Sequence, residues 1–405
     1  MNLKNGTLED WLKAPPAKAL KRGGDENKYF SKYETFKTFL AQGLHKEVTM
    51  NAILEEYKNK HKSKVIWLND HGPEHVATVI KRASELLSGN SELNVKEVFL
   101  LLNAIQIHDL GNFYGRNGHE RKVLDAISAS LGEIVFDAME TMYIKFIAQV
   151  HGGKVTYLDG THSKNTIGEL KEVEMLDGYP IRLRLLASIL RFADELADDK
   201  RRADKYTLDK GVMPKGSEIF HAYAACLDTV SVDIKNRAIK LHYKVPKKYL
   251  LNRLGKMDGK KVVEKYLIDE IYERLIKVHD ERIYCSKFWK RVIDIDEIWA
   301  EIDFYDDQAK LTNVRNSIRV SLNDNDYPHS PKSIYTLCPN LKYEDGTKID
   351  GAGIAKEVRK TTQAANLSVK DLGGLGKIKT KGIQKTKLLT KKAAKRGVKR
   401  SNNKK

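Results

Sequence analysis

Apolar residues recur every three or four positions through most of the first 200 residues, which is the period of an amphipathic α-helix. The run at 95–107, VKEVFLLLNAIQI, is apolar around most of its circumference and predicts a buried helix. Residues 180–196 are also apolar on most sides and begin with a proline, which suits the first turn of a helix. The pattern predicts helices over 33–44, 49–61, 75–87, 95–107, 120–150 and 180–196.

The period shortens to two residues after about position 205. Residues 229–245 alternate apolar and polar side chains on both sides of Asn236 and Arg237, which predicts a β-hairpin. A long amphipathic helix is predicted over 259–284 and a short strand over 317–322. Residues 290–307 fit either a strand or a short helix.

These patterns predict a mainly α protein, with an all-helical domain followed by a small α+β domain and a basic disordered tail. Proline, asparagine and aspartate accumulate after about residue 326, and the chain from residue 351 on contains no Phe, Trp or Tyr. The predicted parts are an N-terminal helical segment (1–65), the helical domain (66–205), the α+β domain (206–325), a linker (326–350) and the tail (351–405).

Most of the net charge of +18 lies in the predicted tail, which holds 17 Lys and Arg against only Glu357 and Asp371. A Lys-rich segment without aromatic side chains cannot stack on bases and binds through charge alone. The tail therefore predicts a salt-sensitive arm for nucleic acid or for an acidic protein partner, or else a solubilising extension.

Cysteine content and hydropathy exclude several protein classes. The three cysteines are far apart and odd in number, which argues against a disulfide framework and a thiolate metal site. No signal-peptide pattern and no membrane-spanning apolar run is present. We expect a cytoplasmic protein without a membrane contact.

Titratable residues at helix ends suggest a metal site. His75 lies in the first turn of a predicted helix, and His108 and Asp109 end the next one. A carboxylate at a helix C-terminus faces the negative end of the helix dipole, unless a bound cation reverses the effect. Asp194 interrupts an apolar helix and needs a buried partner; the alternative to a metal is an ion pair with Arg191, three residues earlier.

The ordered set HGPEHV, HDLGN and RFADELADD, over residues 66–205, resembles the HD-domain metal-dependent phosphohydrolases. The resemblance implies that His75, His108, Asp109 and Asp194 bind a divalent transition metal: Mn, Fe, Co or Zn, with Mg as a further option. These N and O ligands suit such ions.

The same resemblance offers two roles for His119. Together with Glu120, it matches the histidine and acid that protonate the leaving group in some HD triphosphohydrolases. In two-metal HD phosphodiesterases a histidine in this region is instead a ligand, and His151 would join it at a second metal. The third alternative is that His119 is a surface histidine without a role in catalysis or metal binding.

Arginines near these residues are candidates for phosphate binding, because a guanidinium binds phosphate with two parallel hydrogen bonds. They are Arg116 and Arg121 beside His119, and Arg201 and Arg202 after the Asp194 helix. The alternative is a set of solvated surface charges.

The function that these features imply is metal-dependent hydrolysis of nucleotide phosphoesters, most closely that of a deoxynucleoside triphosphate triphosphohydrolase. The first alternative is a phosphodiesterase or nuclease that acts on cyclic or short oligonucleotides with a two-metal site. The second is a regulatory nucleotide- or nucleic-acid-binding protein with a vestigial site. The motifs NDHGPEH and LRFADELADD also resemble those of bacterial HD proteins of phage defence. We further expect a homo-oligomer or a complex.

Overall fold

The computed structural model describes most of the chain before residue 362. The described residues are 6–20, 26–43, 45, 72–89, 92–114, 119–120, 122–123, 135–259, 261–289, 292–306, 309–310, 317–323 and 333–361.

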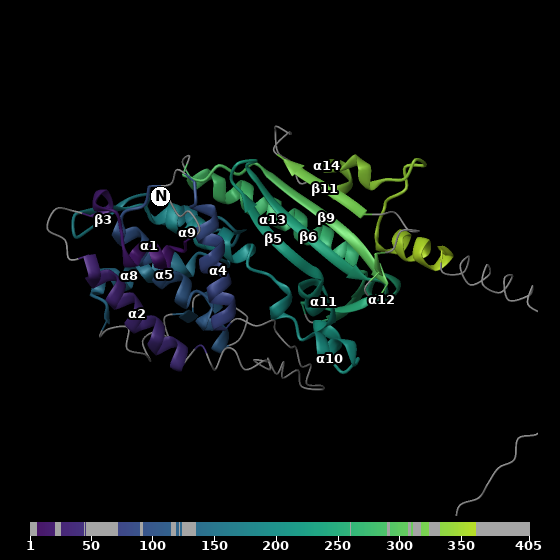
Figure 1. Cartoon of the computed structure of the whole chain (residues 1–405), viewed down its shortest axis with the longest axis horizontal. Coiled ribbons are helices and arrows are strands. Elements are labelled where there is room, and N and C mark those ends of the chain that lie inside the picture. Colours follow the sequence, from purple (N-terminus) through teal and green to yellow (C-terminus); the bar gives the residue numbers. More distant parts are fainter. Residues whose placement is uncertain are drawn as a thin grey trace, which may run out of the picture. The chain divides into compact units, whose positions relative to one another are not determined.

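Among the described residues, the six α-helices with defined bounds before residue 196 form the helical part of the fold (Figure 1). Helix α5 lies at its centre and is buried along its whole length, as its apolar sequence predicts. Its first turn is fixed by Asn94, whose side chain accepts a hydrogen bond from the backbone N–H of Glu97, while the Glu97 carboxylate accepts one from Asn94 N–H. The helices are α1 (Leu8–Lys13), α2 (Glu26–Gln42), α4 (Pro73–Leu86), α5 (Val95–Ile107), α8 (Ala138–Gln149) and α9 (Leu183–Glu195).

Two short antiparallel hairpins lie between α8 and α9, so the prediction of an all-helical domain is wrong for this stretch. They consist of β1 (Val155–Thr156) with β2 (His162–Ser163), and β3 (Glu174–Leu176) with β4 (Tyr179–Ile181). The second is closed by Asp177 and Gly178, whose φ angles of 50° and 74° suit a two-residue hairpin turn. Strands of two or three residues are too short for a period to show in the sequence.

The second half of the described chain is built on a five-stranded sheet. Its strands are β5 (Leu227–Asp233), β6 (Ala238–Pro246), β9 (Glu297–Asp306), β10 (Ala309–Lys310) and β11 (Ser317–Asn323). The pairing of β5 with β6 confirms the hairpin predicted around Asn236 and Arg237. Residues 297–306 are a strand rather than a helix, and β9 runs parallel to β6.

Helix α13 (Leu267–Trp289) connects the two halves of the fold, because it packs against both α9 and strand β9. Figure 1 shows it lying across one face of the sheet. A further hairpin, β7 (Leu254–Asp258) with β8 (Lys261–Lys265), precedes it. Shorter α-helices in this half are α10 (Lys205–Asp209), α11 (Glu218–Cys226), α12 (Lys247–Leu251) and α14 (Ile334–Leu337). The 3₁₀ helices are η1 (Ala17–Ala19), η2 (Leu110–Tyr114), η3 (Ile167–Glu169), η4 (Lys200–Arg202), η5 (Lys215–Ser217) and η6 (Pro339–Leu341).

Residues 333–361 correct the sequence prediction of a linker that leads into a disordered tail. Residues 351–361 are helical, and Ile334, Leu341, Ile349, Ile354 and Val358 are all buried. The apolar residues are sparse among polar ones, which is why composition alone suggests disorder. The rest of the predicted tail, residues 362–405, lies outside the described residues.

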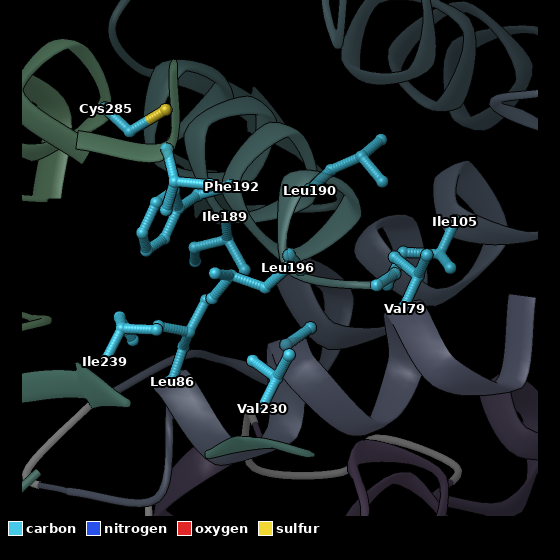
Figure 2. Close-up of a cluster of buried hydrophobic side chains, with 14 of the residues drawn as sticks. Val79, Leu86, Ile105, Ile189, Leu190, Phe192, Leu196, Val230, Ile239 and Cys285 are labelled. Carbon is cyan, nitrogen blue, oxygen red and sulfur yellow. The ribbon is translucent and has the colours of Figure 1, made fainter. Parts of the chain in front are cut away.

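One hydrophobic core extends from the helices into the sheet. Figure 2 shows the place where they meet, with labelled side chains from α4 (Val79, Leu86), α5 (Ile105), α9 (Ile189, Leu190, Phe192), the residue after it (Leu196), β5 (Val230), β6 (Ile239) and α13 (Cys285). The boundaries predicted near residues 65, 205 and 325 stay predictions, and this core crosses the second of them. Among the described residues, no helix combines the length and the apolar character that crossing a membrane requires.

Candidate metal centre

Three helix ends bring the four predicted metal ligands together. His75 lies in the first turn of α4, His108 directly follows α5, and Asp194 lies in the last turn of α9. The Nε2 atom of His75 is 3.1 Å from Oδ1 of Asp194 and 3.4 Å from Oδ2 of Asp109. His108 Nε2 is 3.4 Å from the same oxygen of Asp109 and 3.5 Å from that of Asp194. We call His75, His108, Asp109 and Asp194 the first cluster.

The first cluster has the dimensions of a cation site. Metal–ligand bonds of about 2.0–2.2 Å place neighbouring ligand atoms about 3.0–3.5 Å apart in tetrahedral or octahedral geometry. The four distances of 3.1–3.5 Å fall in this range. Nε2 of His108 is buried and makes no hydrogen bond, although it faces two carboxylate oxygens. A buried nitrogen in that position fits a metal ligand.

The backbone fixes which nitrogen of His108 can bind a metal. Its Nδ1 lies 2.8 Å from the carbonyl oxygen of Ile105, three residues earlier. A carbonyl only accepts hydrogen bonds, so Nδ1 must carry the proton and donate it. In the neutral ring Nε2 then has a free lone pair that points into the cluster, the usual arrangement of a metal-binding histidine.

Charge in the first cluster favours any cation. Burial alone would disfavour a charged imidazole, but the Asp109 and Asp194 carboxylates raise the pKa of His108 to about 10. Against its own burial, the adjacent imidazoles of His108 and His75 hold the pKa of Asp194 well below its usual range. The cluster thus binds either a proton or a metal ion, and a metal ion displaces the proton.

A second cluster lies on the other side of Asp109 and consists of Asp109, His119 and His151. Oδ1 of Asp109 is 3.2 Å from Nε2 of His119 and 3.8 Å from Nε2 of His151. The two Nε2 atoms are 3.3 Å apart. Glu120 lies outside this group, with its Oε2 3.3 Å from Nδ1 of His119.

His151 repeats the arrangement of His108. It lies just beyond α8, and its Nδ1 donates a hydrogen bond to the carbonyl oxygen of Ala148 at 2.6 Å. Burial and the nearby charges of His108 and His119 lower the pKa of His151 to about 3, so its Nε2 is unprotonated. If His119 donates Nδ1–H to Glu120, both Nε2 atoms carry a lone pair and face each other, an arrangement that a cation between them would stabilise.

Asn112 is a further residue of the site, and its role is not among those predicted from the sequence. Its Nδ2 donates a hydrogen bond of 3.0 Å to Oδ1 of Asp109 and fixes the rotation of the carboxylate. The signal was present in HDLGN, because an amide three residues after an aspartate in a tight turn is well placed for this contact.

Two glycines allow the second cluster to form. A Cβ at Gly111 would lie 1.8 Å from the backbone oxygen of His119, so only glycine lets the two backbones approach this closely. At Gly153, with φ of 74°, a Cβ would lie 2.5 Å from Oε1 of Glu120. Larger residues at either place would displace the His119–Glu120 segment.

Arg191 does not pair with Asp194, which removes the alternative explanation for that carboxylate. Its guanidinium binds Glu281 of α13 through two hydrogen bonds of 2.6 and 2.8 Å. Asp194 instead faces the two histidines of the first cluster, and its side chain is 27% exposed while His75 and His108 are fully buried. The first cluster is therefore accessible from the Asp194 side.

Of the predicted phosphate-binding arginines, Arg116 and Arg121 lie outside the described residues. Arg201 is exposed, is paired with Asp199 and donates a hydrogen bond of 2.9 Å to Oγ1 of Thr78, one turn after His75. Arg202 is engaged by Asp198 at 2.7 Å. Arg201 is near the first cluster, and phosphate binding by either arginine stays a prediction.

Comparison with known proteins yields one family. The HD-CE family model matches residues 54–277, more than half of the chain and the whole of both clusters. No curated protein matches the chain. An HD-type domain with a His and Asp cluster that could hold a metal fits a metal-dependent hydrolase. The chain belongs to the HD-CE family of HD-type domains.

Proposed function

We propose that this protein is a cytoplasmic phosphohydrolase that cleaves a nucleotide phosphoester with two divalent cations, one on each side of Asp109. The orientation of the Asp109 carboxylate carries the proposal. Oδ2 is 3.4 Å from His75 and His108 in the first cluster, and Oδ1 is 3.2 Å from His119 in the second. A carboxylate that offers one oxygen to each of two ligand groups is suited to bridge two cations.

Each cluster would hold one cation. His75, His108, Asp109 and Asp194 would hold one cation, and Asp109, His119 and His151 the other. When bound, such cations activate water and polarise a phosphoryl oxygen. The Ile105 and Ala148 carbonyls hold His108 and His151 in the tautomer that binding requires. Arg201, which donates a hydrogen bond to Thr78 one turn after His75, would bind a phosphate oxygen.

A second candidate is the single-metal deoxynucleoside triphosphate triphosphohydrolase expected from the sequence. The 3.3 Å contact between Nδ1 of His119 and Oε2 of Glu120 favours it. Glu120 would hold the proton on His119, and His119 would pass a proton to the leaving oxygen without binding metal.

Metal stoichiometry separates the two candidates. The metal bound per chain is measured by elemental analysis after loading with Mn²⁺, for wild type, His119→Ala and His151→Ala. The control is His162→Ala, a change at an exposed histidine of β2. We expect about two ions in wild type and in the control, and about one in both test variants. One ion in every protein would overturn the two-cation proposal and support the second candidate.

A nucleotide panel identifies the reaction. Deoxynucleoside triphosphates, nucleoside monophosphates, cyclic dinucleotides and short oligonucleotides are incubated with Mn²⁺, Mg²⁺ or Co²⁺, and the products are separated by chromatography. We expect diester or monoester cleavage that is lost in His108→Ala. Release of inorganic triphosphate alone would support the second candidate. Absence of turnover and of bound metal in wild type would support a vestigial site.

The proposed context is defence against phage, which the sequence resemblance implies. The test is plating efficiency on cells that produce wild type or His108→Ala at equal levels. We expect protection with wild type only, and equal plaque counts in both would remove this role.

A further inference from the structure

A cavity of about 860 Å³ lies between α9, α13 and the segment that follows strand β2. Its size falls within the range of small-molecule sites. None of its lining residues belongs to the two clusters. The residues that matter here are Lys164, Arg184, Arg191, Tyr284, Lys287 and Phe288.

Three of the five basic residues that line the cavity have no acidic partner among the described residues. Among the described residues, Lys164, Arg184 and Lys287 form no ion pair, and Arg184 donates its hydrogen bonds to the carbonyl oxygens of Leu170 and Gly168. Lys164 and Lys287 are exposed and can reach a ligand.

Acidic residues of the lining are fewer and mostly engaged. Glu281 binds Arg191, and Glu273 binds Lys256 at 3.2 Å as well as Lys265. Asp280 is the third acidic residue, while Lys277 adds a further cation that is paired with Glu195. The excess of basic over acidic side chains in the lining favours a ligand with several negative charges.

One wall of the cavity is aromatic. The rings of Tyr284 and Phe288 are 5.5 Å apart and meet edge to face at 79°. The guanidinium of Arg191 lies 4.6 Å from the centre of the Tyr284 ring. A planar ring can stack on such a surface, whereas inorganic phosphate would leave it uncovered.

We propose that this cavity binds a phosphate ester with a planar ring, in chemical class a nucleotide, as an effector site separate from the metal centre. Phosphate groups would contact Lys164, Arg184 and Lys287, and the ring would lie against Tyr284 and Phe288.

Hydrogen bonds connect the cavity to the second cluster. Arg191 donates a hydrogen bond of 3.0 Å to Oγ1 of Thr166, and this hydroxyl donates one of 2.9 Å to the carbonyl oxygen of Val150. Val150 precedes His151 directly. Arg191 also lies one turn before Asp194 on α9. A ligand that moves Arg191 therefore acts on a residue from each cluster.

Binding is tested on the full chain in EDTA, so that no metal can hold a phosphate at the clusters. The probe is ATP labelled with N-methylanthraniloyl, followed by fluorescence. We expect Lys164→Glu and Lys287→Glu each to weaken binding about tenfold or more, since each removes a charged contact. Lys235→Glu, in the exposed β5–β6 turn, and His108→Ala should bind the probe as wild type does. Equal affinity in all the lysine variants, or loss of binding in His108→Ala, would overturn the site.

The effector role is tested by Mn²⁺ affinity with and without saturating probe. Coupling between sites is typically about 5–150-fold, and we expect a change of at least fivefold in wild type. Thr166→Val should keep the probe affinity but lose this change, because it lacks the hydroxyl. Unchanged Mn²⁺ affinity in wild type would overturn the effector role. Probe binding in metal-free protein does not depend on the proposed hydrolysis, so the two proposals can fail separately.

Discussion

The Asp109 carboxylate lies with Oδ1 3.2 Å from Nε2 of His119 and with Oδ2 turned towards the first cluster. Asp194, by contrast, contacts only the first cluster. Asp109 thus contacts both clusters and Asp194 only one, although both belong to the ligand set predicted from the sequence.

This difference predicts unequal effects of the same substitution. Asp109→Asn should lower the bound Mn²⁺ from about two ions per chain to nearly none, because it weakens both clusters. Asp194→Asn should leave about one ion, held by Asp109, His119 and His151. Elemental analysis gives the ratio, and circular dichroism verifies that both variants are folded. Identical losses in the two variants would contradict a bridging Asp109.

Gly111→Ala should disturb the second cluster selectively. The new Cβ would overlap the backbone oxygen of His119, so we expect a loss of about 1–3 kcal/mol in the free energy of unfolding and the release of one metal ion. The control is Gly152→Ala, where a Cβ meets nothing within 4 Å. Chemical denaturation and metal analysis measure both effects. A Gly111→Ala protein that matches wild type in both would show that the close approach is not required.

Two truncations should differ sharply. Ending the chain after Thr361 should leave stability, metal content and turnover intact and reduce salt-sensitive binding to nucleic acid. Ending it after Asp350 also removes the buried Ile354 and Val358, each of which contributes about 1.5–3 kcal/mol. Thermal melts and filter binding at several salt concentrations compare the two. Equal melting temperatures would mean that residues 351–361 do not stabilise the fold.

Glu270 should stabilise the fold in a pH-dependent way. Burial would raise its pKa, but a hydrogen bond from Lys256 and the charges of Arg274 and Lys265 lower it to about 2 from an ordinary 4.5. Its contribution is therefore complete above pH 4.5 and declines as the pH falls towards 2, with a total of about 3 kcal/mol. Urea denaturation of wild type and Glu270→Gln should converge as the pH is lowered. The exposed Glu264→Gln serves as the control, and a gap independent of pH would refute the assignment.

The sequence predicts what helical periodicity reports, namely which faces are buried and where helices end. His108 and Asp109 end an apolar helix and Asp194 interrupts another, but the full set with His75 is what the family resemblance implies. The structure brings all four together. Their role as ligands stays a prediction until metal is measured.

Contacts between residues that are far apart in the chain cannot be predicted from helical periodicity. Arg191 binds Glu281, 90 positions later, although the sequence suggests Asp194, which is three positions away. The parallel pairing of β6 with β9 is equally invisible, because alternation of apolar residues shows that a strand is half buried but not which strand lies beside it. Asp177–Gly178 is a dipeptide typical of hairpin turns. The hairpin is not predicted because its strands are too short to show an alternating pattern.

The contact between α9 and α13 bears on how such proteins can be recombined. Helix α9 carries Asp194 for the metal centre, while Arg191 and Phe192 contact Glu281 and Trp289 of α13. A fragment that stops near residue 205 would expose this apolar side of α9 and leave a buried arginine without its counter-ion. A chimaera between relatives would therefore have to inherit α9 and α13 as a pair, from one parent.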